Sequence, residues 1–261
     1  MTRLRTGGAT PLRVLLPLAF AAAALLAWEL LVRVQEIPSY VLPAPTAIFA
    51  ALRDSADLVA QAARTSGLNA LVGLVAGGVL AVLAAVAAVR SRVLREALLP
   101  LSAAAGAMPI VALAPLLNTM FTSTSDVPRR LVVTIVVFFP VFVNTVRGLS
   151  LVQPVHADLL RSYAVSGWAT TRTVRLPGAL PHMFTGLRLA SSLAVIAAVV
   201  AEYFGGLQDG LGSRITSAAS SSAYPRAWAY VCAACLLGLL AYGAALLLER
   251  LVTPWKSHPQ R

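Results

Sequence analysis

The sequence is poor in charge and has almost no lysine. Only 12% of its 261 residues are charged and 58% are hydrophobic, a composition that excludes an ordinary water-soluble domain. Lys256 follows Trp255 rather than glycine, so this single lysine belongs to no G-x-x-x-x-G-K-[ST] phosphate loop. The spacing of His156, His182 and His258 is not that of a metal site, and no G-x-S-x-G motif occurs. We therefore expect no catalytic residues, no bound metal and no cofactor in this chain.

Cysteine is also scarce. The two cysteines, Cys232 and Cys235, stand at i, i+3 spacing within an apolar stretch. A C-x-x-C pair can be redox-active, but that role requires an accessible site on a thioredoxin-like scaffold. We expect both to be small buried packing residues, with redox chemistry as the open alternative.

The hydrophobic residues gather into stretches long enough to cross a bilayer, for which a helix needs about 20 apolar residues. Six such windows occur: Leu12–Val34, Leu68–Val89, Ala97–Phe121, Leu131–Leu149, Met183–Phe204 and Ala227–Leu251. The first could be a signal peptide, but its apolar stretch exceeds the usual length of about 7 to 15 residues. We therefore predict a retained anchor and an all-α polytopic membrane protein with six transmembrane helices.

The net charge of +11 would suit nucleic acid, but the basic residues follow the predicted topology instead. If the N-terminus is cytoplasmic, the inside segments hold Arg3, Arg5, Arg13, Arg90, Arg92, Arg95, Arg147, Arg161, Arg172, Arg175, Arg188, Arg250, Lys256 and Arg261. The outside loops hold fewer: Arg53, Arg64, Arg129, Arg130, Arg214 and Arg226. This excess favours two cytoplasmic termini and no nucleic-acid partner. The adjacent pair Arg129 and Arg130 lies on the wrong side for this rule.

These features divide the chain into three parts. Residues 1–34 form the cytoplasmic N-terminus and first membrane helix, and residues 35–67 form an outer loop with a surface helix. Residues 68–261 form a core of five membrane helices that contains the cytoplasmic loop 150–182. In this loop we expect two short surface helices and then a turn set by Pro177 into the fifth span. Such a loop is suited to docking a partner.

Glycines and prolines mark the membrane windows. Gly73 and Gly77 place a G-x-x-x-G spacing in the second window, which is typical of closely packed helices. Pro109 in the third window and Pro140 in the fourth release backbone carbonyls, which must be satisfied by neighbouring helices or a water-filled cavity. The prolines therefore indicate either kinks around a translocation path or simple packing kinks.

Few ionisable residues lie in the windows, although secondary transporters place such residues deep in the membrane. Glu29 has Arg33 four residues on, which predicts a helical ion pair. Glu202, near the outer end of the fifth window, can reach water or a helix N-terminus. With Asn118 and Asn144 it forms our set of possible substrate-path residues. A secondary transporter or channel without an ATPase partner is the alternative function, and a membrane scaffold is a third.

The segment from Asp158 to Pro181 resembles the cytoplasmic EAA loop of ABC importer permeases, whose pattern is E-A-A, three residues, G, nine residues and I-x-L-P. The residues at the matching spacings are Asp158, Leu159, Leu160, Ala164, Val174, Leu176 and Pro177. Aspartate replaces the glutamate, two leucines replace the alanines, and alanine replaces the glycine. The stretches 108–116, 138–149 and 201–212 are similar to the sulfonate, taurine, nitrate and thiamine-precursor branch of these permeases.

The resemblance implies a subunit that carries substrate across the bacterial inner membrane without hydrolysing ATP. Two permease copies, as a homodimer, would form the path above two ATPase subunits that hold ATP and Mg. A periplasmic or lipid-anchored binding protein would deliver a small organic anion or a heterocyclic vitamin precursor. The coupling helix would run from Asp158 to Gly167, and Pro177 would fix the turn that transmits its motion. The other interpretation of this loop is an ordinary basic connector.

Overall fold

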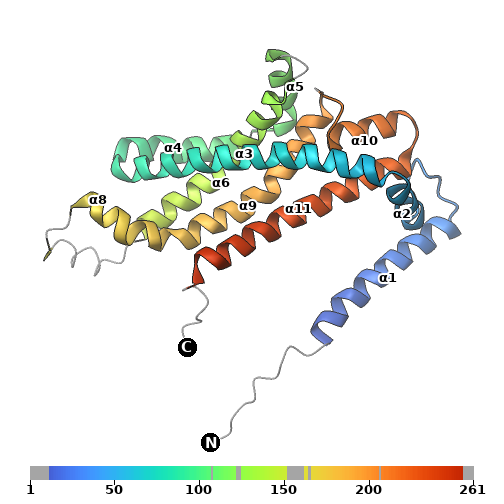
Figure 1. The fold of residues 1–261 in the computed structure, drawn as a ribbon, viewed down its shortest axis with the longest axis horizontal. Helices are drawn as coiled ribbons and strands as arrows, with labels where there is room; N and C mark the ends of the chain where they lie inside the picture. Colours follow the sequence, from blue (N-terminus) through green and yellow to red (C-terminus); the bar gives the residue numbers. More distant parts are fainter. Residues whose placement is uncertain are drawn as a thin grey trace, which may run out of the picture.

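A computed structural model describes residues 12–106, 108–121, 125–151, 162–163, 166–205 and 207–254. Every regular element among them is a helix (Figure 1), which confirms the all-α prediction. The helices are α1 (Leu12–Val34), α2 (Pro45–Asp54), α3 (Ala56–Arg90), α4 (Arg92–Gly106), α5 (Ile110–Met120), α6 (Val127–Ser150), α8 (Gly167–Thr170), the π-helix η1 (Thr171–Arg175), α9 (Leu176–Tyr203), α10 (Leu211–Ser220) and α11 (Tyr224–Val252).

Five helical segments in the described part of the chain are long and apolar enough to cross a membrane. They lie in α1, α3, α6, η1 with α9, and α11, and they match five of the six predicted windows to within a few residues at the ends. Following the predicted topology, we call the end of the bundle that carries α2 and α10 the outer end. The end that carries α8 is the inner end (Figure 1).

The third predicted window is divided. Helix α4 ends at Gly106 and α5 begins at Ile110, so the prediction of one helix over Ala97–Phe121 is wrong. Pro109 is the N-cap of α5 in extended conformation, with φ −70° and ψ 108°. Proline lacks an N–H and also disfavours helix in the residue before it, so the break falls here. The count of six spans and the cytoplasmic termini stay predictions.

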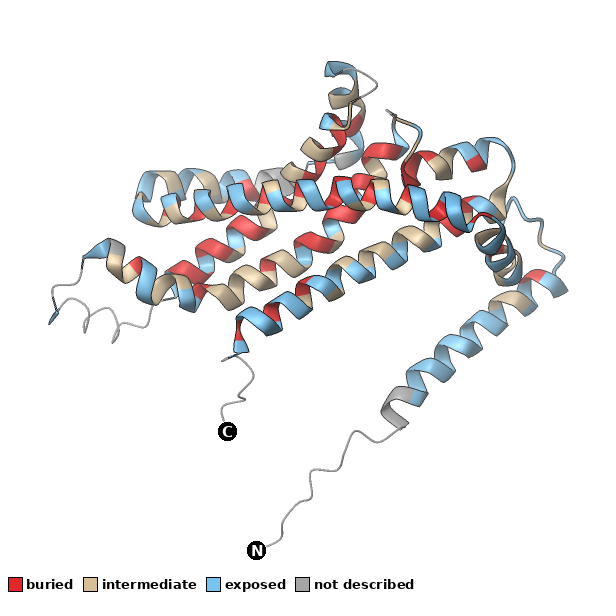
Figure 2. Ribbon diagram, in the orientation of Figure 1, coloured by how far each residue is buried: buried red, intermediate tan, exposed pale blue. Residues whose placement is uncertain are grey.

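The centre of the bundle is α6, with α3 and α9 packed against it. Figure 2 shows buried positions concentrated on these three helices, whereas α1 and α11 are mostly exposed. A Cβ added to Gly77 would lie 2.6 Å from the Thr134 carbonyl oxygen, and one added to Gly73 would overlap Val133. These glycines therefore let α3 approach α6 closely, which confirms the packing role predicted for the G-x-x-x-G spacing.

Close backbone contact also joins α9 to α6. A Cβ added to Gly186 would lie 2.9 Å from the Pro140 carbonyl oxygen, and one added to Gly148 would lie 3.0 Å from Ala179 Cα. The Pro140 carbonyl accepts a hydrogen bond of 2.8 Å from Asn144 Nδ2. Because there is no room for either helix to slide without a clash, α3, α6 and α9 form one tightly packed unit.

Helix α1 lies apart from this unit and is held at its outer end, where it meets α2 (Figure 1). Glu29 Oε1 forms the predicted ion pair with Arg33 Nε at 2.6 Å. Glu29 Oε2 accepts a 3.0 Å hydrogen bond from the Thr46 N–H in the first turn of α2. The surface helix predicted for residues 35–67 is α2 together with the first turns of α3, so the boundary predicted at residue 67 falls inside α3.

Helix α11 exposes most of its surface outside the bundle. Cys232 and Cys235 are both exposed and form no disulfide, so the prediction that they are buried is wrong. An apolar helix in a membrane protein can face lipid as readily as protein, and hydropathy does not distinguish the two.

The inner end of α9 continues directly into η1 and α8. Gly167 to Tyr203 form one helical run, and Pro177 lies in the first turn of α9. The prediction of a turn at Pro177 is wrong, because the helical run passes through this proline. The π-helix η1 lies just before it, with the Leu176 N–H donating to the Thr171 carbonyl oxygen, so the wider turn lies next to the residue that lacks an N–H. Leu176 keeps helical angles of φ −66° and ψ −51°. Most of the first of the two surface helices predicted in loop 150–182 lies outside the described residues.

Candidate functional site

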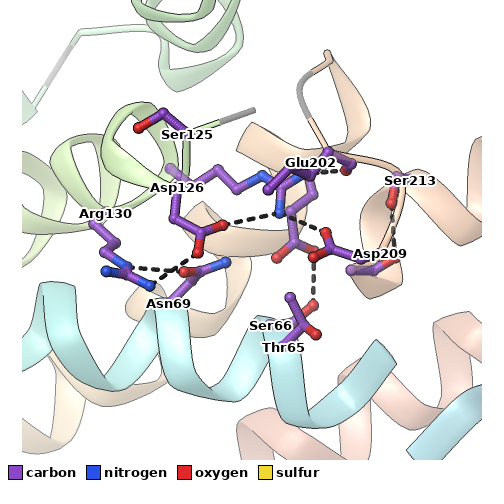
Figure 3. Close-up of polar contacts among 12 residues, drawn as sticks. Thr65, Ser66, Asn69, Ser125, Asp126, Arg130, Glu202, Asp209 and Ser213 are labelled. Atoms are coloured by element: carbon purple, nitrogen blue, oxygen red, sulfur yellow. Dashed lines mark hydrogen bonds and ion pairs between the residues drawn. The ribbon is translucent and has the colours of Figure 1, made fainter. Parts of the chain in front are cut away.

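A buried polar cluster lies near the outer end, where α3, α6 and α9 meet the connection to α10 (Figure 3). Glu202 of α9 has no exposed surface. Its Oε2 accepts a 2.6 Å hydrogen bond from Ser66 Oγ of α3 and a 3.2 Å bond from the Gly212 N–H. The Leu211 N–H in turn donates to Ser66 Oγ at 2.8 Å.

This carboxylate therefore lies at the N-terminus of α10, whose N-cap is Gly210. A helix N-terminus has free N–H groups and a positive dipole end, both of which stabilise an anion. Gly210 leaves space for the carboxylate, since a Cβ there would overlap Glu202. The predicted contact of Glu202 with a helix N-terminus is confirmed, and its predicted contact with water is not seen because the residue is fully buried.

Arg129 of α6 binds the connection between α9 and α10. Its side chain has no exposed surface, and its Nη1 forms a 2.8 Å ion pair with Asp209 Oδ1. Its Nη2 donates a hydrogen bond to the Leu207 carbonyl oxygen. A buried cation needs a carboxylate and further acceptors to offset its lost hydration. Arg129 therefore fastens this connection to α6.

The neighbouring Arg130 joins α6 to α3. Its Nη2 lies 2.9 Å from Asp126 Oδ2, and its Nε donates a 3.1 Å hydrogen bond to Asn69 Oδ1 (Figure 3). The two arginines that fall on the wrong side for the positive-inside rule are thus bound within a polar cluster. They do not act as free loop charges, which is what the rule counts.

The three possible path residues do not form one site. Asn118 of α5 lies near the outer end, since a Cβ at Gly205 would be 3.5 Å from its Nδ2. Asn144 packs at the level of Gly186, which precedes Glu202 by 16 residues on α9. That separation corresponds to about 24 Å along a helix. Glu202 and Asn118 thus belong to the outer end, and Asn144 lies far from Glu202.

An apolar groove of about 510 Å³ opens between α3, α9 and α11 in the inner half of the bundle. Its lining includes Leu71 and Val79 of α3, Met183 and Leu187 of α9, and Leu248 of α11. No charged side chain lines it, so it offers nothing to orient a polar ligand.

Residues 77–254 match the family described as "Binding-protein-dependent transport system inner membrane component". The chain belongs to this family of ABC transporter permeases. This permease is accordingly a multi-pass inner-membrane protein, and a permease component is not itself an enzyme.

Individual relatives agree with the family assignment. A probable ABC transporter permease protein of Haemophilus influenzae is 31% identical over 77% of this chain and 81% of its own length. The riboflavin transport system permease protein RibX of Chloroflexus aurantiacus is 36% identical over 64% of this chain and 61% of its own length. The formylaminopyrimidine transport permease protein ThiX of Halalkalibacterium halodurans is 29% identical over 92% of this chain and 95% of its own length. Relatives named for aliphatic sulfonates or taurine match 57% to 59% of this chain.

The loop residues of the permease are only partly placed. Asp158, Leu159, Leu160 and Ala164 lie outside the described residues. Gly167 begins α8, Val174 lies in η1, and Leu176 and Pro177 begin α9. The described part of the predicted coupling region is therefore helical and continuous with a membrane span.

Sequence reasoning missed Ser66, Asp126 and Asp209, and it did not assign Arg129 to a site. One local signal was available, because Asp126 precedes Arg129 and Arg130 by three and four residues, the spacing of helical ion pairs. Ser66 and Asp209 carry no such signal. Their partners are 136 and 80 residues away in the sequence.

Proposed function

We propose that this permease moves a heterocyclic vitamin or vitamin precursor into the cell, as a homodimer served by two ATPase subunits and a substrate-binding protein. The observation that carries the substrate class is the extent of the similarity. The relatives named for formylaminopyrimidine and riboflavin align with 92% and 64% of this chain. Those named for sulfonates and taurine align with 57% to 59%.

The buried polar cluster near the outer end favours a neutral substrate, because both of its arginines already bind carboxylates. Arg129 is the one fully buried arginine among the described residues, and Asp209 already binds it. Its neighbour Arg130 is bound to Asp126. A permeating sulfonate would need a cation or free helix N-terminus that is not already bound to a carboxylate. The N-terminus of α10 is bound to Glu202.

A small organic anion is the second candidate, favoured by the relatives named for aliphatic sulfonates and taurine. Asn118 suits both candidates, because its Nδ2 is buried near Gly205 without a hydrogen-bond partner among the described residues. An amide N–H can donate to a sulfonate oxygen, but it can equally donate to the ring nitrogen of a heterocycle.

The energy for transport would enter at the inner end. Asp158, Leu159, Leu160, Ala164, Gly167, Val174, Leu176 and Pro177 form the proposed ATPase-coupling region. The support is mechanical: Gly167 begins an unbroken helical run that reaches Tyr203. A force on this end would displace α9 as a rod rather than bend a loop. The possible path residues Asn118, Asn144 and Glu202 lie on or beside α6 and α9.

The test begins with purification of the tagged permease from its native membrane. We expect an ATPase subunit to co-purify in near-equal amount. We also expect to recover a substrate-binding protein, either in the same eluate or in a later step. The isolated binding protein is then titrated with riboflavin, a formylaminopyrimidine and taurine, and the best ligand is used for uptake into proteoliposomes that contain the complex.

Binding of riboflavin or the pyrimidine, followed by ATP-dependent uptake, is the expected result. Preference for taurine would replace the substrate class and leave the ATP-driven mechanism intact. A homo-oligomer that contains no ATPase and still catalyses uptake would contradict the proposed coupling.

A further inference from the structure

An ion pair joins α9 to α11 in the inner half of the bundle. Arg188 Nε lies 3.0 Å from Glu249 Oε2, and the side chains of Arg188 and Glu249 are 24% and 7% exposed. Both residues lie inside candidate membrane spans. Charged residues at such positions are expensive to bury, and they persist in pairs or at functional sites.

The inner half of α11 has few other buried contacts. From Leu236 to Val252, only Ala245 and Glu249 are buried, and their spacing of four residues puts both on one narrow face. Leu247 and Leu251, on the other faces, are exposed. The inner half of α11 thus meets the bundle along a thin stripe that ends in the ion pair.

The apolar groove lies directly beside this stripe. Leu187 and Leu248 both line it, and each is the neighbour in sequence of one member of the ion pair. Helix α9 packs against α6 through close-packed glycines and also contacts α3 and α11, and the groove opens where these three helices meet in the inner half. Side chains that line a groove lack contacts on that side, so apolar packing holds α11 less firmly beside the groove than in a filled core.

The ion pair is also well placed along α9. Arg188 follows Leu176, the first residue of α9, by 12 residues, or about 18 Å of α-helix. The helical run continues without a break from Gly167 through Arg188. A displacement applied near Gly167 would therefore reach Arg188 with little loss. In the part of the chain that the structure describes, Arg188–Glu249 is the ion pair that links α9 to α11.

We infer that Arg188 and Glu249 are positioning residues that make α11 follow α9 when the coupling region moves. This inference rests on the proposed function, since it assumes that the partner ATPase displaces the inner end of α9. Neither residue needs to touch the substrate. Their role is to make α11 move together with α9.

The experiment measures helix positions in the permease–ATPase complex reconstituted in lipid nanodiscs. Spin labels are attached to cysteines at Val93 of α4, Leu189 of α9 and Leu247 of α11, which are all exposed, after Cys232 and Cys235 are replaced by serine. The distances from 93 to 189 and from 93 to 247 are recorded without nucleotide and after trapping with Mg-ATP and orthovanadate.

In the unmutated complex we expect both distances to shift on trapping. In Glu249→Gln, the shift between 93 and 189 is kept and the shift between 93 and 247 is lost. The charge-swapped protein Arg188→Glu/Glu249→Arg recovers the lost shift, which a purely structural role of either side chain would not produce. Glu96→Gln is the matched control because it breaks the exposed Arg92–Glu96 pair and leaves both shifts unchanged.

Arg188→Gln/Glu249→Gln, which removes both charges of this ion pair, carries the test if Glu249→Gln does not assemble. A normal shift of the 93–247 distance in a variant without the ion pair would overturn this inference and leave the proposed coupling intact. A charge-swapped protein that assembles but does not recover the 93–247 shift would have the same consequence. An unmutated complex in which neither distance responds to trapping would overturn the proposed coupling and this inference with it.

Discussion

The two ends of the bundle are held together by different forces. At the outer end, Glu202 and Arg129 are fully buried and bind three other segments through hydrogen bonds and ion pairs. In the inner half, α11 borders an apolar groove and is joined to α9 by the Arg188–Glu249 pair. Directional bonds permit one arrangement of helices, whereas apolar contacts between helices in lipid are weaker and less specific. The comparison indicates a fixed outer end and, in the inner half, a more adaptable contact between α11 and the rest of the bundle.

The largest expected effect comes from breaking the inner end where the ATPase would dock. Ala164→Trp adds bulk at the expected glycine position, and Asp158→Lys reverses the charge at the expected glutamate position. We expect each variant to lose transport while the complex still hydrolyses ATP, measured as uptake and phosphate release in proteoliposomes. Ser220→Trp, an exposed position at the outer end, is the control and should retain transport. Normal transport in both loop variants would remove the assignment of the coupling helix.

A large loss of stability is expected when the outer cluster loses a charge. Asp209→Ala leaves Arg129 buried next to the more distant Asp126, 3.5 Å away. The loss should be about 3 kcal/mol in the free energy of unfolding, because a buried cation is left poorly compensated. An SDS-unfolding titration in mixed micelles measures it. Stability within about 0.5 kcal/mol of the parent, the range of an ordinary surface substitution, would show that this ion pair does not hold the outer end.

A smaller loss of stability is expected when a methyl group is added to the tightly packed N-terminus of α10. A Cβ at Gly212 would lie 2.7 Å from the Tyr203 backbone nitrogen and would overlap the Val199 carbonyl. Gly212→Ala should therefore cost about 1 to 3 kcal/mol, the usual range for overpacking. Gly238→Ala in α11 meets nothing within 4 Å and should be neutral or stabilising. Equal melting temperatures for the two variants would contradict the packing described at α10.

The smallest effect is expected at an exposed ion pair that belongs to neither the outer cluster nor the contact between α9 and α11. Arg92 and Glu96 of α4 form a 2.7 Å pair with side chains 83% and 60% exposed. Such pairs contribute about 0.3 to 0.5 kcal/mol, so Glu96→Gln should change the melting temperature by no more than the scatter between preparations. A loss as large as that of Asp209→Ala would mean that α4 packs against a surface not seen in this chain alone.

Much of the helical framework follows from the sequence. Hydropathy alone locates α1, α3, α6, α9 and α11, because a membrane span is a long local signal. The Glu29–Arg33 pair is also local, since both residues lie on one face of a helix. The break at Pro109 was missed because proline is tolerated inside membrane helices, so its presence alone does not end one.

The site is less predictable because its partners are far apart in the sequence. Counting charges placed Arg129 and Arg130 in an outer loop, and only the fold brings Asp209 to Arg129. Cys232 and Cys235 were expected inside because hydropathy does not separate a lipid-facing position from a packed one. The Arg188–Glu249 pair joins residues 61 positions apart, and no motif connects them.

A site-specific photo-crosslink shows whether a separate ATPase docks at the loop 150–182 at the inner end of the bundle. Single cysteines at Ser162 and Ser220, in a protein that lacks Cys232 and Cys235, carry the photo-crosslinker in native membranes. We expect a crosslinked ATPase band from position 162 and none from position 220, together with labelling of the two positions from opposite sides of the membrane. An ATPase crosslink from position 220 alone, or labelling of both positions from one side, would contradict this expectation.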